Sequence, residues 1–174
     1  TLIYNAEYDE YECRLGNMSD HSYTGLVYYN NDYYYVSNGW YNWRYSGLAE
    51  YNGGYYYVTD GKINWWYTGI TKYENNWYYV SNGCLDWGYT GLVFAYDQWY
   101  YVENGFISPE KDTLVFNNGE WFGVQDGRVN WAENALIYYN GDYYFVTNGR
   151  VAFGYTGLAP VGDDWCYIYN GLFA

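Results

Sequence analysis

The sequence has few positive charges and no long apolar run, and each absence excludes a class of protein. Its 174 residues include 7 Lys and Arg against 20 Asp and Glu, which gives a formal net charge of -13. Because clustered cations are needed to bind a phosphate backbone, we exclude nucleic acid as a partner. No stretch approaches the roughly 20 apolar residues that cross a bilayer, so no transmembrane segment is predicted. No signal peptide is visible, but the chain begins at Thr1 without Met, and we therefore expect a mature segment or fragment.

Cysteine and histidine are also scarce. Cys13, Cys84 and Cys166 form no CxxC motif, and we interpret them as isolated small apolar side chains. The only histidine, His21, has no neighbours at ligand spacing, so no metal ion and no cofactor is predicted. Asp20-His21-Ser22 contains the residue types of a catalytic triad, but adjacent residues of a strand point to opposite faces. No pair of acids recurs as in a glycosidase cleft, and we predict that the chain is not an enzyme.

Aromatic residues are abundant and follow a repeat. They make up 27% of the chain, with Tyr 30, Trp 10 and Phe 7, and this apolar surface excludes disorder. Seven Asn-Gly or Asp-Gly pairs recur at intervals of 22 residues, and a short, mostly aromatic run ending in a β-branched residue precedes each pair. The pairs begin at Asn38, Asp60, Asn82, Asn104, Asp126, Asn148 and Asn170. A Tyr-Thr/Ser-Gly-aliphatic motif recurs with the same period, for example at Tyr67–Ile70, but Lys111-Asp112-Thr113 and Glu133-Asn134-Ala135 replace it in two repeats.

This period predicts an all-β fold, a β-hairpin solenoid of 22-residue repeats that forms an elongated superhelix. Asn-Gly and Asp-Gly favour type I′ turns, in which both central residues have positive φ. The residue at Val36 barely changes between repeats and is predicted to be core, and alternation is predicted to place Ile63 and Trp65 on one face of a strand. We expect a single repeat domain, with seven repeats over residues 23–174, the last slightly truncated. Residues 1–22 are expected to form a degenerate capping repeat because terminal repeats are atypical.

The pattern Thr-Gly-aliphatic, Trp-Tyr-Tyr-Val and Asn-Gly, clearest over residues 68–83, resembles the cell-wall-binding repeat superfamily. That superfamily includes choline-binding modules, streptococcal glucan-binding repeats and the C-terminal repeats of clostridial toxins. The resemblance covers nearly the whole chain from residue 23. It implies a left-handed β-hairpin superhelix, ligand clefts between successive hairpins, and a secreted or surface-attached location in a Gram-positive bacterium.

The choline-binding pattern has Thr-Gly-Trp, and the resemblance implies that this Trp is one wall of an aromatic cage. Here Leu or Ile stands at that position in every repeat, from Leu26 to Leu158. A cage needs two or three π faces around the cation, so choline binding is not predicted unless another aromatic restores the wall. The resemblance assigns ligand contact to the first residue of the aromatic run, kept as Trp77, Trp99, Trp121 and Trp165. The candidates to restore this wall are Trp43, Trp65, Trp87 and Trp131, and the sequence leaves open whether they face the same cleft.

The remaining candidates are the positions that vary between repeats, represented by Tyr28, Tyr29 and Trp40. Variable positions on a constant scaffold are places where specificity is encoded or where exposed residues drift. From these features we predict a multivalent module that binds a glycan or cell-wall polymer by stacking sugars on Trp and Tyr. The alternative is an adhesin module whose Tyr/Trp-rich face binds a host glycoprotein or immunoglobulin. A third interpretation is a passive spacer without a ligand.

Overall fold

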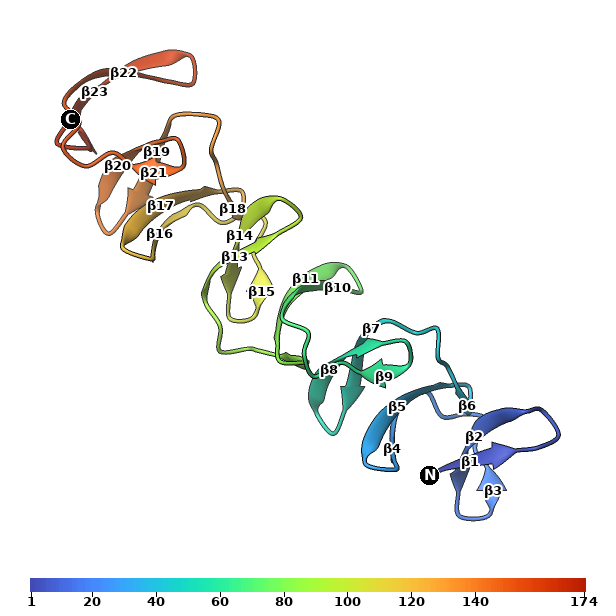
Figure 1. Ribbon diagram of the computed structural model, residues 1–174. Helices are drawn as coiled ribbons and strands as arrows, with labels where there is room; N and C mark the ends of the chain where they lie inside the picture. Colours follow the sequence, from blue (N-terminus) through green and yellow to red (C-terminus); the bar gives the residue numbers. More distant parts are fainter. The chain divides into compact units, whose positions relative to one another are not determined.

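The computed structural model describes all 174 residues, and its regular secondary structure consists of β-strands alone. Two longer strands followed by one short strand form each repeat (Figure 1). This arrangement confirms the prediction of an all-β fold built from β-hairpin repeats. The chain contains no helix that is long and apolar enough to span a membrane. It divides into two compact units, Thr1–Trp87 and Gly88–Ala174, which are described separately.

Each unit contains four repeats. The strands of the unit Thr1–Trp87 are β1 (Leu2–Asn5), β2 (Glu10–Leu15), β3 (Met18–Ser19), β4 (Gly25–Tyr29), β5 (Asp32–Ser37), β6 (Trp40–Tyr41), β7 (Gly47–Tyr51), β8 (Gly54–Thr59), β9 (Lys62–Ile63), β10 (Gly69–Tyr73), β11 (Asn76–Ser81) and β12 (Cys84–Leu85). Those of the unit Gly88–Ala174 are β13 (Gly91–Ala95), β14 (Gln98–Glu103), β15 (Phe106–Ile107), β16 (Thr113–Asn117), β17 (Glu120–Gln125), β18 (Arg128–Val129), β19 (Ala135–Tyr139), β20 (Asp142–Thr147), β21 (Arg150–Val151), β22 (Gly157–Val161), β23 (Asp164–Tyr169) and β24 (Leu172–Phe173).

The short third strand joins one repeat to the one before it. In the repeat β7–β9, β7 and β8 form the antiparallel hairpin, and β9 pairs back onto β8. The same short strand pairs with β5 of the preceding repeat, where Tyr34 lies opposite Lys62. The backbone N–H of Tyr35 donates to the carbonyl of Gly61 at 2.8 Å. Neighbouring hairpins are therefore held by backbone hydrogen bonds as well as by side-chain packing, which brings side chains of two repeats into contact.

The turn before each short strand from β6 (Trp40–Tyr41) onward has the predicted type I′ character. Asp60 has φ 50° and Gly61 has φ 74°, so both central residues are in the left-handed region. A Cβ on Gly61 would lie 2.7 Å from the carbonyl oxygen of Asn42 and 2.7 Å from Cα of Trp43. Glycine is required at this turn by its backbone conformation and also by the close approach of the preceding repeat, specifically the loop that contains Trp43.

The Tyr-Thr-Gly motif stabilises these turns. The Thr68 hydroxyl oxygen accepts the backbone N–H of Asn82 at 3.0 Å, and the Tyr67 hydroxyl donates to the carbonyl of Ile70 at 2.7 Å. The ring of Tyr67 also stacks on Tyr57 of the preceding hairpin, with centroids 3.7 Å apart. The motif thus stabilises the turn and the start of the next strand by hydrogen bonds, and it contributes a stacked ring pair between the hairpins.

One of the two repeats that lack the Tyr-Thr-Gly motif keeps the hydrogen bond to the turn, but uses a different side chain. The Asp112 carboxylate replaces the threonine hydroxyl and accepts the N–H of Asp126 at 2.9 Å. Lys111 replaces the tyrosine and donates from its ammonium to Glu103 at 2.8 Å. The stacking tyrosine is thus replaced by a lysine whose ion-pair partner lies two residues beyond Tyr101, the equivalent of Tyr57, and the register of the repeat is preserved.

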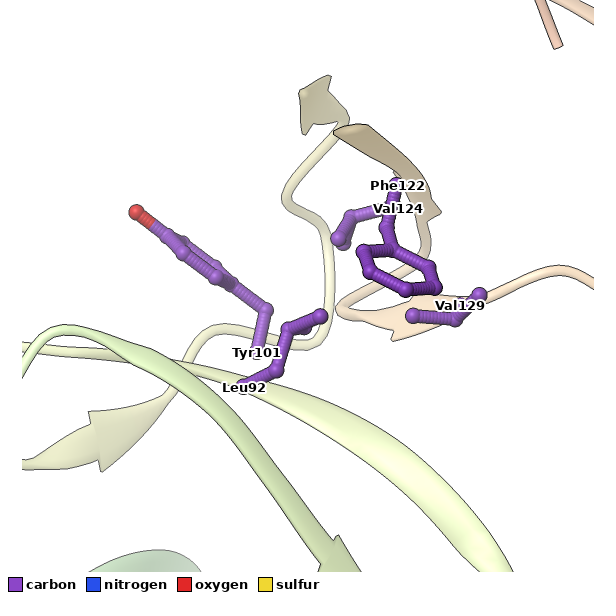
Figure 2. Packing of buried hydrophobic residues seen from close by; sticks show 5 residues of the cluster. All are labelled: Leu92, Tyr101, Phe122, Val124 and Val129. Carbon is purple, nitrogen blue, oxygen red and sulfur yellow. The ribbon is translucent and has the colours of Figure 1, made fainter. Parts of the chain in front are cut away.

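The predicted core position is confirmed. Val36 and its equivalents are almost completely buried, at Val58, Val80, Val102, Val124, Val146 and Ile168. Figure 2 shows how core residues of consecutive repeats pack together: Leu92 and Tyr101 belong to one hairpin, and Phe122, Val124 and Val129 to the next repeat. Burial of each such side chain contributes roughly 1.5–3 kcal/mol, and much of the buried surface is created only when repeats stack.

Residues 2–19 form a hairpin repeat with a longer first turn. Residues 6–9 separate β1 from β2, whereas two residues separate the equivalent strands β4 and β5. Leu2 lies opposite Cys13, as Leu26 lies opposite Tyr35. The two extra turn residues explain why the aliphatic residue near the start of the chain is out of phase with the later repeats.

The prediction that Ile63 and Trp65 share one face of a strand was wrong. The strand β9 ends at Ile63, which is buried, and Trp65 lies in the following turn with 42% of its surface exposed. The reason is local: the side-chain oxygen of Asn64 accepts the backbone N–H of Trp66 at 3.0 Å, and this Asx turn ends the strand.

Candidate ligand-binding site

Four of the predicted ligand-contacting tryptophans lie in the loops after the short strands. Trp43, Trp65, Trp87 and Trp131 have 57%, 42%, 52% and 37% of their surface exposed. In three of these loops an asparagine directly before the tryptophan accepts the N–H of the residue after it; the three asparagines are Asn42, Asn64 and Asn130. The repeated Asx turn therefore positions each of these rings at the surface.

An aromatic box forms where Trp65 meets the preceding hairpin. Tyr33 on β5 lies 5.1 Å from Tyr51 on β7 and 6.3 Å from Trp65, measured between ring centroids. Tyr56 on β8 meets Trp65 edge to face at 5.9 Å. Trp65 and the first residue of the preceding aromatic run thus face the same cleft. The sequence left this question open, and here the loop tryptophan supplies a wall to the cleft.

Two further boxes use the equivalent residues. In the second, Tyr55 lies 5.6 Å from Tyr73 and 6.5 Å from Trp87, which also meets Tyr78 at 5.8 Å. In the third, Trp121 lies 5.5 Å from Tyr139, and Tyr144 lies 6.2 Å from Phe153. The residues of the third box, together with Leu114, line a cavity of about 120 Å³. Leu114 holds the Thr-Gly-Trp position, so the missing tryptophan is replaced by an aliphatic wall of the same cleft.

Two other tryptophans of the predicted set, Trp99 and Trp131, lie in different surroundings. Trp99 packs against the buried cluster that contains Leu92 and Phe122. Trp131 meets Phe122 at 6.0 Å, and the guanidinium of Arg150 lies 5.4 Å from both ring centroids. The rings of Phe122 and Trp131 thus already carry a cation from the next repeat.

Trp77 is half-buried, and Trp165 is 70% exposed. Trp165 belongs to the last repeat, so no later hairpin within residues 1–174 adds walls around it. Trp43 has the guanidinium of Arg44 over its ring at 4.7 Å.

The three variable-position candidates lie in different surroundings. Tyr28 lies 4.9 Å from Tyr33 and so adjoins the first aromatic box. Tyr29 is half-buried between the rings of Tyr11 and Tyr34. Trp40 stacks on His21 at 5.3 Å. Tyr28 therefore lies next to a box, whereas Tyr29 and Trp40 lie outside the three boxes.

Two polar pockets occupy equivalent places in the two units. The first, of about 380 Å³, includes Glu10, Trp40, Trp43 and Arg44 in its lining. The second, of about 360 Å³, includes Gln98, Gln125, Arg128, Trp131 and Glu133. Glu10 and Gln98 are four repeats apart, as are Trp43 and Trp131. Each polar pocket is thus built from the start of one hairpin's second strand and from the short strand and loop of the next repeat.

The aromatic boxes are electrically neutral. Burial raises the pKa of Tyr33, and neighbouring Tyr51 raises it further. Burial is also the main cause of a raised pKa at Tyr73. Near neutral pH these phenols stay protonated, so the boxes present π faces and hydroxyl donors without a formal charge. Such an arrangement suits a sugar ring or an organic cation.

The Asp20-His21-Ser22 segment does not form a triad. The Ser22 hydroxyl donates to Asp20 at 2.6 Å, while the His21 ring stacks on Trp40 and its Nε2 lies 3.7 Å from Glu12. The Ser22 hydroxyl is therefore hydrogen-bonded to Asp20 and not to His21.

Sequence reasoning missed two kinds of residue at this surface. The box walls Tyr51, Tyr73 and Tyr139 follow the first aromatic of the preceding run by the same number of residues each time, a spacing that signals the contact. Trp66 is 93% exposed. Its signal was the only Trp-Trp pair in the chain.

These features define a β-hairpin repeat protein with aromatic clefts between consecutive hairpins. A family model described as a choline-binding repeat matches residues 22–41, 44–64, 65–86, 88–107 and 134–152, more than half of the chain. The chain belongs to this family, whose members are binding modules that occur in surface or secreted bacterial proteins.

Solved structures include similar repeats. The crystal structure of choline-binding protein F from Streptococcus pneumoniae is 19% identical, covers 99% of this chain and 56% of that chain, and has a TM-score of 0.36. The crystal structure of CbpF in complex with ipratropium is 20% identical to this chain and has a TM-score of 0.37. The match covers 99% of this chain and 58% of that chain. Alternansucrase in complex with isomaltononaose is 16% identical to this chain and has a TM-score of 0.27. The match covers 99% of this chain and 16% of that chain. The chain thus spans little more than half of choline-binding protein F. No curated protein sequence matches it.

Proposed function

We propose that this chain is a multivalent, non-catalytic module that binds a glycan or cell-wall polymer through the aromatic boxes. The observation that carries this proposal is the recurrence of the box, with walls from two consecutive hairpins each time. A cleft with several aromatic faces and a few hydroxyl groups is typical of a small-ligand site. Sugar rings present C–H faces to the π surfaces, and their hydroxyls accept hydrogen bonds from the tyrosines.

Recurrence also determines how such a module would reach useful affinity. Each box is small and partly open, and we expect each to bind a single sugar weakly. When several boxes engage one polymer, later binding events are intramolecular, and the overall affinity exceeds that of any single box. We infer that the parent protein is secreted or attached to the surface of a Gram-positive bacterium, where such polymers are accessible.

A quaternary ammonium group such as choline is the second candidate for the same boxes. Trp65 and Trp87 supply the aromatic wall that the Thr-Gly-Leu/Ile motif lacks. The chain also places its own cations on aromatic rings, with Lys62 at 4.7 Å from Tyr34 and Arg150 at 5.4 Å from Trp131. These contacts favour cation binding by the same kind of surface.

Tryptophan fluorescence during titration tests the proposal. The panel contains choline, glucan, cell-wall polysaccharide, mucin glycans and immunoglobulin. We expect saturable binding of a glycan, and we expect Trp87→Ala to remove one site per chain because it opens the second box. Trp165→Ala is the matched control, since it removes an exposed tryptophan that has no box around it.

Each other outcome has a distinct meaning. Saturation by choline alone would favour the second candidate, and a response to immunoglobulin alone would support the adhesin alternative. Equal losses in Trp87→Ala and Trp165→Ala would contradict the assignment of the boxes as the sites. No response to any member would favour a passive spacer.

A further inference from the structure

Some of the few Lys and Arg side chains of this acidic chain form ion pairs with carboxylates, and others do not. Of the 7 Lys and Arg residues, four form ion pairs with carboxylates: Arg14, Lys62, Lys111 and Arg150. The other three, Arg44, Lys72 and Arg128, form none.

Two of the three unpaired cations line the two polar pockets. Arg44 lines the first pocket and Arg128 the second. Arg44 shares its pocket with Glu10, and Arg128 shares its pocket with Asp126 and Glu133, but neither arginine forms an ion pair with these carboxylates. The guanidinium donors of both arginines are therefore available to a ligand. The two arginines come from non-equivalent positions of the repeat, so the pockets share this feature without sharing the residue.

A tryptophan accompanies the free guanidinium in both pockets. Trp43 lies in the first pocket, under Arg44, and Trp131 lies in the second. Amide groups complete the second lining, at Gln98 and Gln125. A planar guanidinium matches a carboxylate with two parallel hydrogen bonds. The neighbouring indole adds an aromatic side chain to each lining, and amides and carboxylates bind hydroxyl groups.

We propose that the two polar pockets bind carboxylate-bearing sugars of an acidic glycan, with Arg44 and Arg128 as the partners of the sugar carboxylate. This inference rests on the proposed function, in which the aromatic boxes bind other residues of the same polymer. The net charge of -13 repels a polyanion in general. The acid preference is therefore local to these pockets, and added salt weakens it by screening.

A matched pair of sugars tests this inference in the full chain. Methyl β-glucuronide and methyl β-glucoside differ in one carboxylate, and tryptophan fluorescence reports binding because both pockets contain an indole. We expect the glucuronide to bind about tenfold more tightly. The double variant Arg44→Gln/Arg128→Gln, which keeps amide donors but removes the charge, should bind the two sugars equally. Lys72→Gln is the control, because it removes the third unpaired cation outside both pockets.

The outcomes separate this inference from the function on which it rests. Equal binding of the two sugars by the wild-type chain would overturn the acid-sugar assignment and leave glycan binding intact. An acid preference that persists in the double variant, or that Lys72→Gln also removes, would overturn the assignment to the pockets. If no polymer or sugar binds at all, the proposed function fails as well. Thermal unfolding of each variant verifies that these exposed substitutions leave the fold unchanged.

Discussion

The repeats β1–β3 and β16–β18 each place two side chains under a third from the next repeat, but the aromatic and polar residues are exchanged between the two repeats. In the unit Thr1–Trp87, Glu12 is buried, His21 lies beside it, and Trp40 of the next repeat covers them by stacking on His21. In the unit Gly88–Ala174, the equivalent residues are two rings, Phe122 and Trp131, and a cation, Arg150, covers them.

In both repeats the covering residue lies directly opposite the buried one across paired strands: Trp40 is opposite Glu12, and Arg150 is opposite Phe122. Because the partners face each other in space, ring and polar group can exchange sequence positions while the contact is kept. These two repeats thus keep a contact between an aromatic and a polar group, whereas the residue at each position differs.

The largest expected effect comes from the glycines that bring each covering residue into place. A Cβ on Gly39 would lie 2.5 Å from the backbone oxygen of Asp20, whereas a Cβ on Gly149 would meet the Trp131 side chain at 2.6 Å. A side chain moves more easily than backbone. We expect Gly39→Ala to lower the free energy of unfolding by about 3 kcal/mol and Gly149→Ala to lower it by less.

The control for both glycine variants is Gly119→Ala. Gly119 also has positive φ, at 88°, but a Cβ there would meet nothing within 4 Å. Its cost is expected to be the backbone strain alone, about 1 kcal/mol. Urea denaturation measures all three variants, and equal losses would show that the close approach of the preceding repeat is unimportant.

The next effect is a dependence of stability on pH in the first repeat. A hydrogen bond from Arg14 is the main cause that lowers the pKa of Glu12 to about 2. Since this pKa is below its unfolded value of about 4.3, the stabilisation is fully present above the unfolded value. It is lost as the pH falls through about 2.

Urea denaturation of the wild type and of Glu12→Gln measures this effect. The difference between the two is expected to be largest near neutral pH and to shrink as the pH falls through this window. Glu120→Gln is the comparison, since it breaks the exposed ion pair with Arg150 and should cost less than about 1 kcal/mol. A pH-independent difference for Glu12→Gln would contradict the expectation.

A smaller effect is expected at Arg150. Arg150→Gln removes the cation from the Phe122 and Trp131 rings and should change the free energy of unfolding by less than about 1 kcal/mol. Its main result should be a gain of function, one additional weak site for choline, visible as a larger fluorescence change at saturation. Glu120→Gln leaves the guanidinium in place and should show no gain. Identical titrations of Arg150→Gln and the wild type would mean that the arginine does not occupy a potential site.

The smallest effect on stability is expected at Trp66, which is 93% exposed. Trp66→Ala should change the free energy of unfolding by less than about 0.5 kcal/mol, and glycan binding should be unchanged because Trp66 is not a box wall. Trp65→Ala, its neighbour in the first box, should weaken glycan binding. If only Trp66→Ala weakened binding to a protein partner, the adhesin alternative would gain support over the box.

Much of the fold was predictable because its determinants are local or periodic. The turn pairs from Asn38-Gly39 onward carry their own backbone preference, and the buried valines recur with them. The longer first turn at residues 6–9 was not predicted, because the acidic segment offers no turn pair at that place. The end of β9 was missed because an Asx turn at Asn64 outweighs strand alternation.

The site was predictable only in part. Exposed rings at Trp43, Trp65 and Trp87 follow from their period and from the excess of aromatic residues. That Trp65 closes a box with Tyr33, whereas Trp131 lies under Arg150, depends on contacts between different repeats. Such contacts depend on which residue of the next repeat lies opposite, and that pairing is a property of the stacked hairpins.

The sequence by itself determined the class of the fold, the period of 22 residues, the core position at Val36 and the acidic, aromatic character of the surface. These properties follow from turn preference, strand propensity and composition, which act within a few residues. Only the tertiary structure decided which rings form boxes, which aromatic pair holds a cation of the chain, and which arginines remain unpaired. Each of these depends on side chains from consecutive repeats meeting across a hairpin interface, where small differences in opposing residues change the contact.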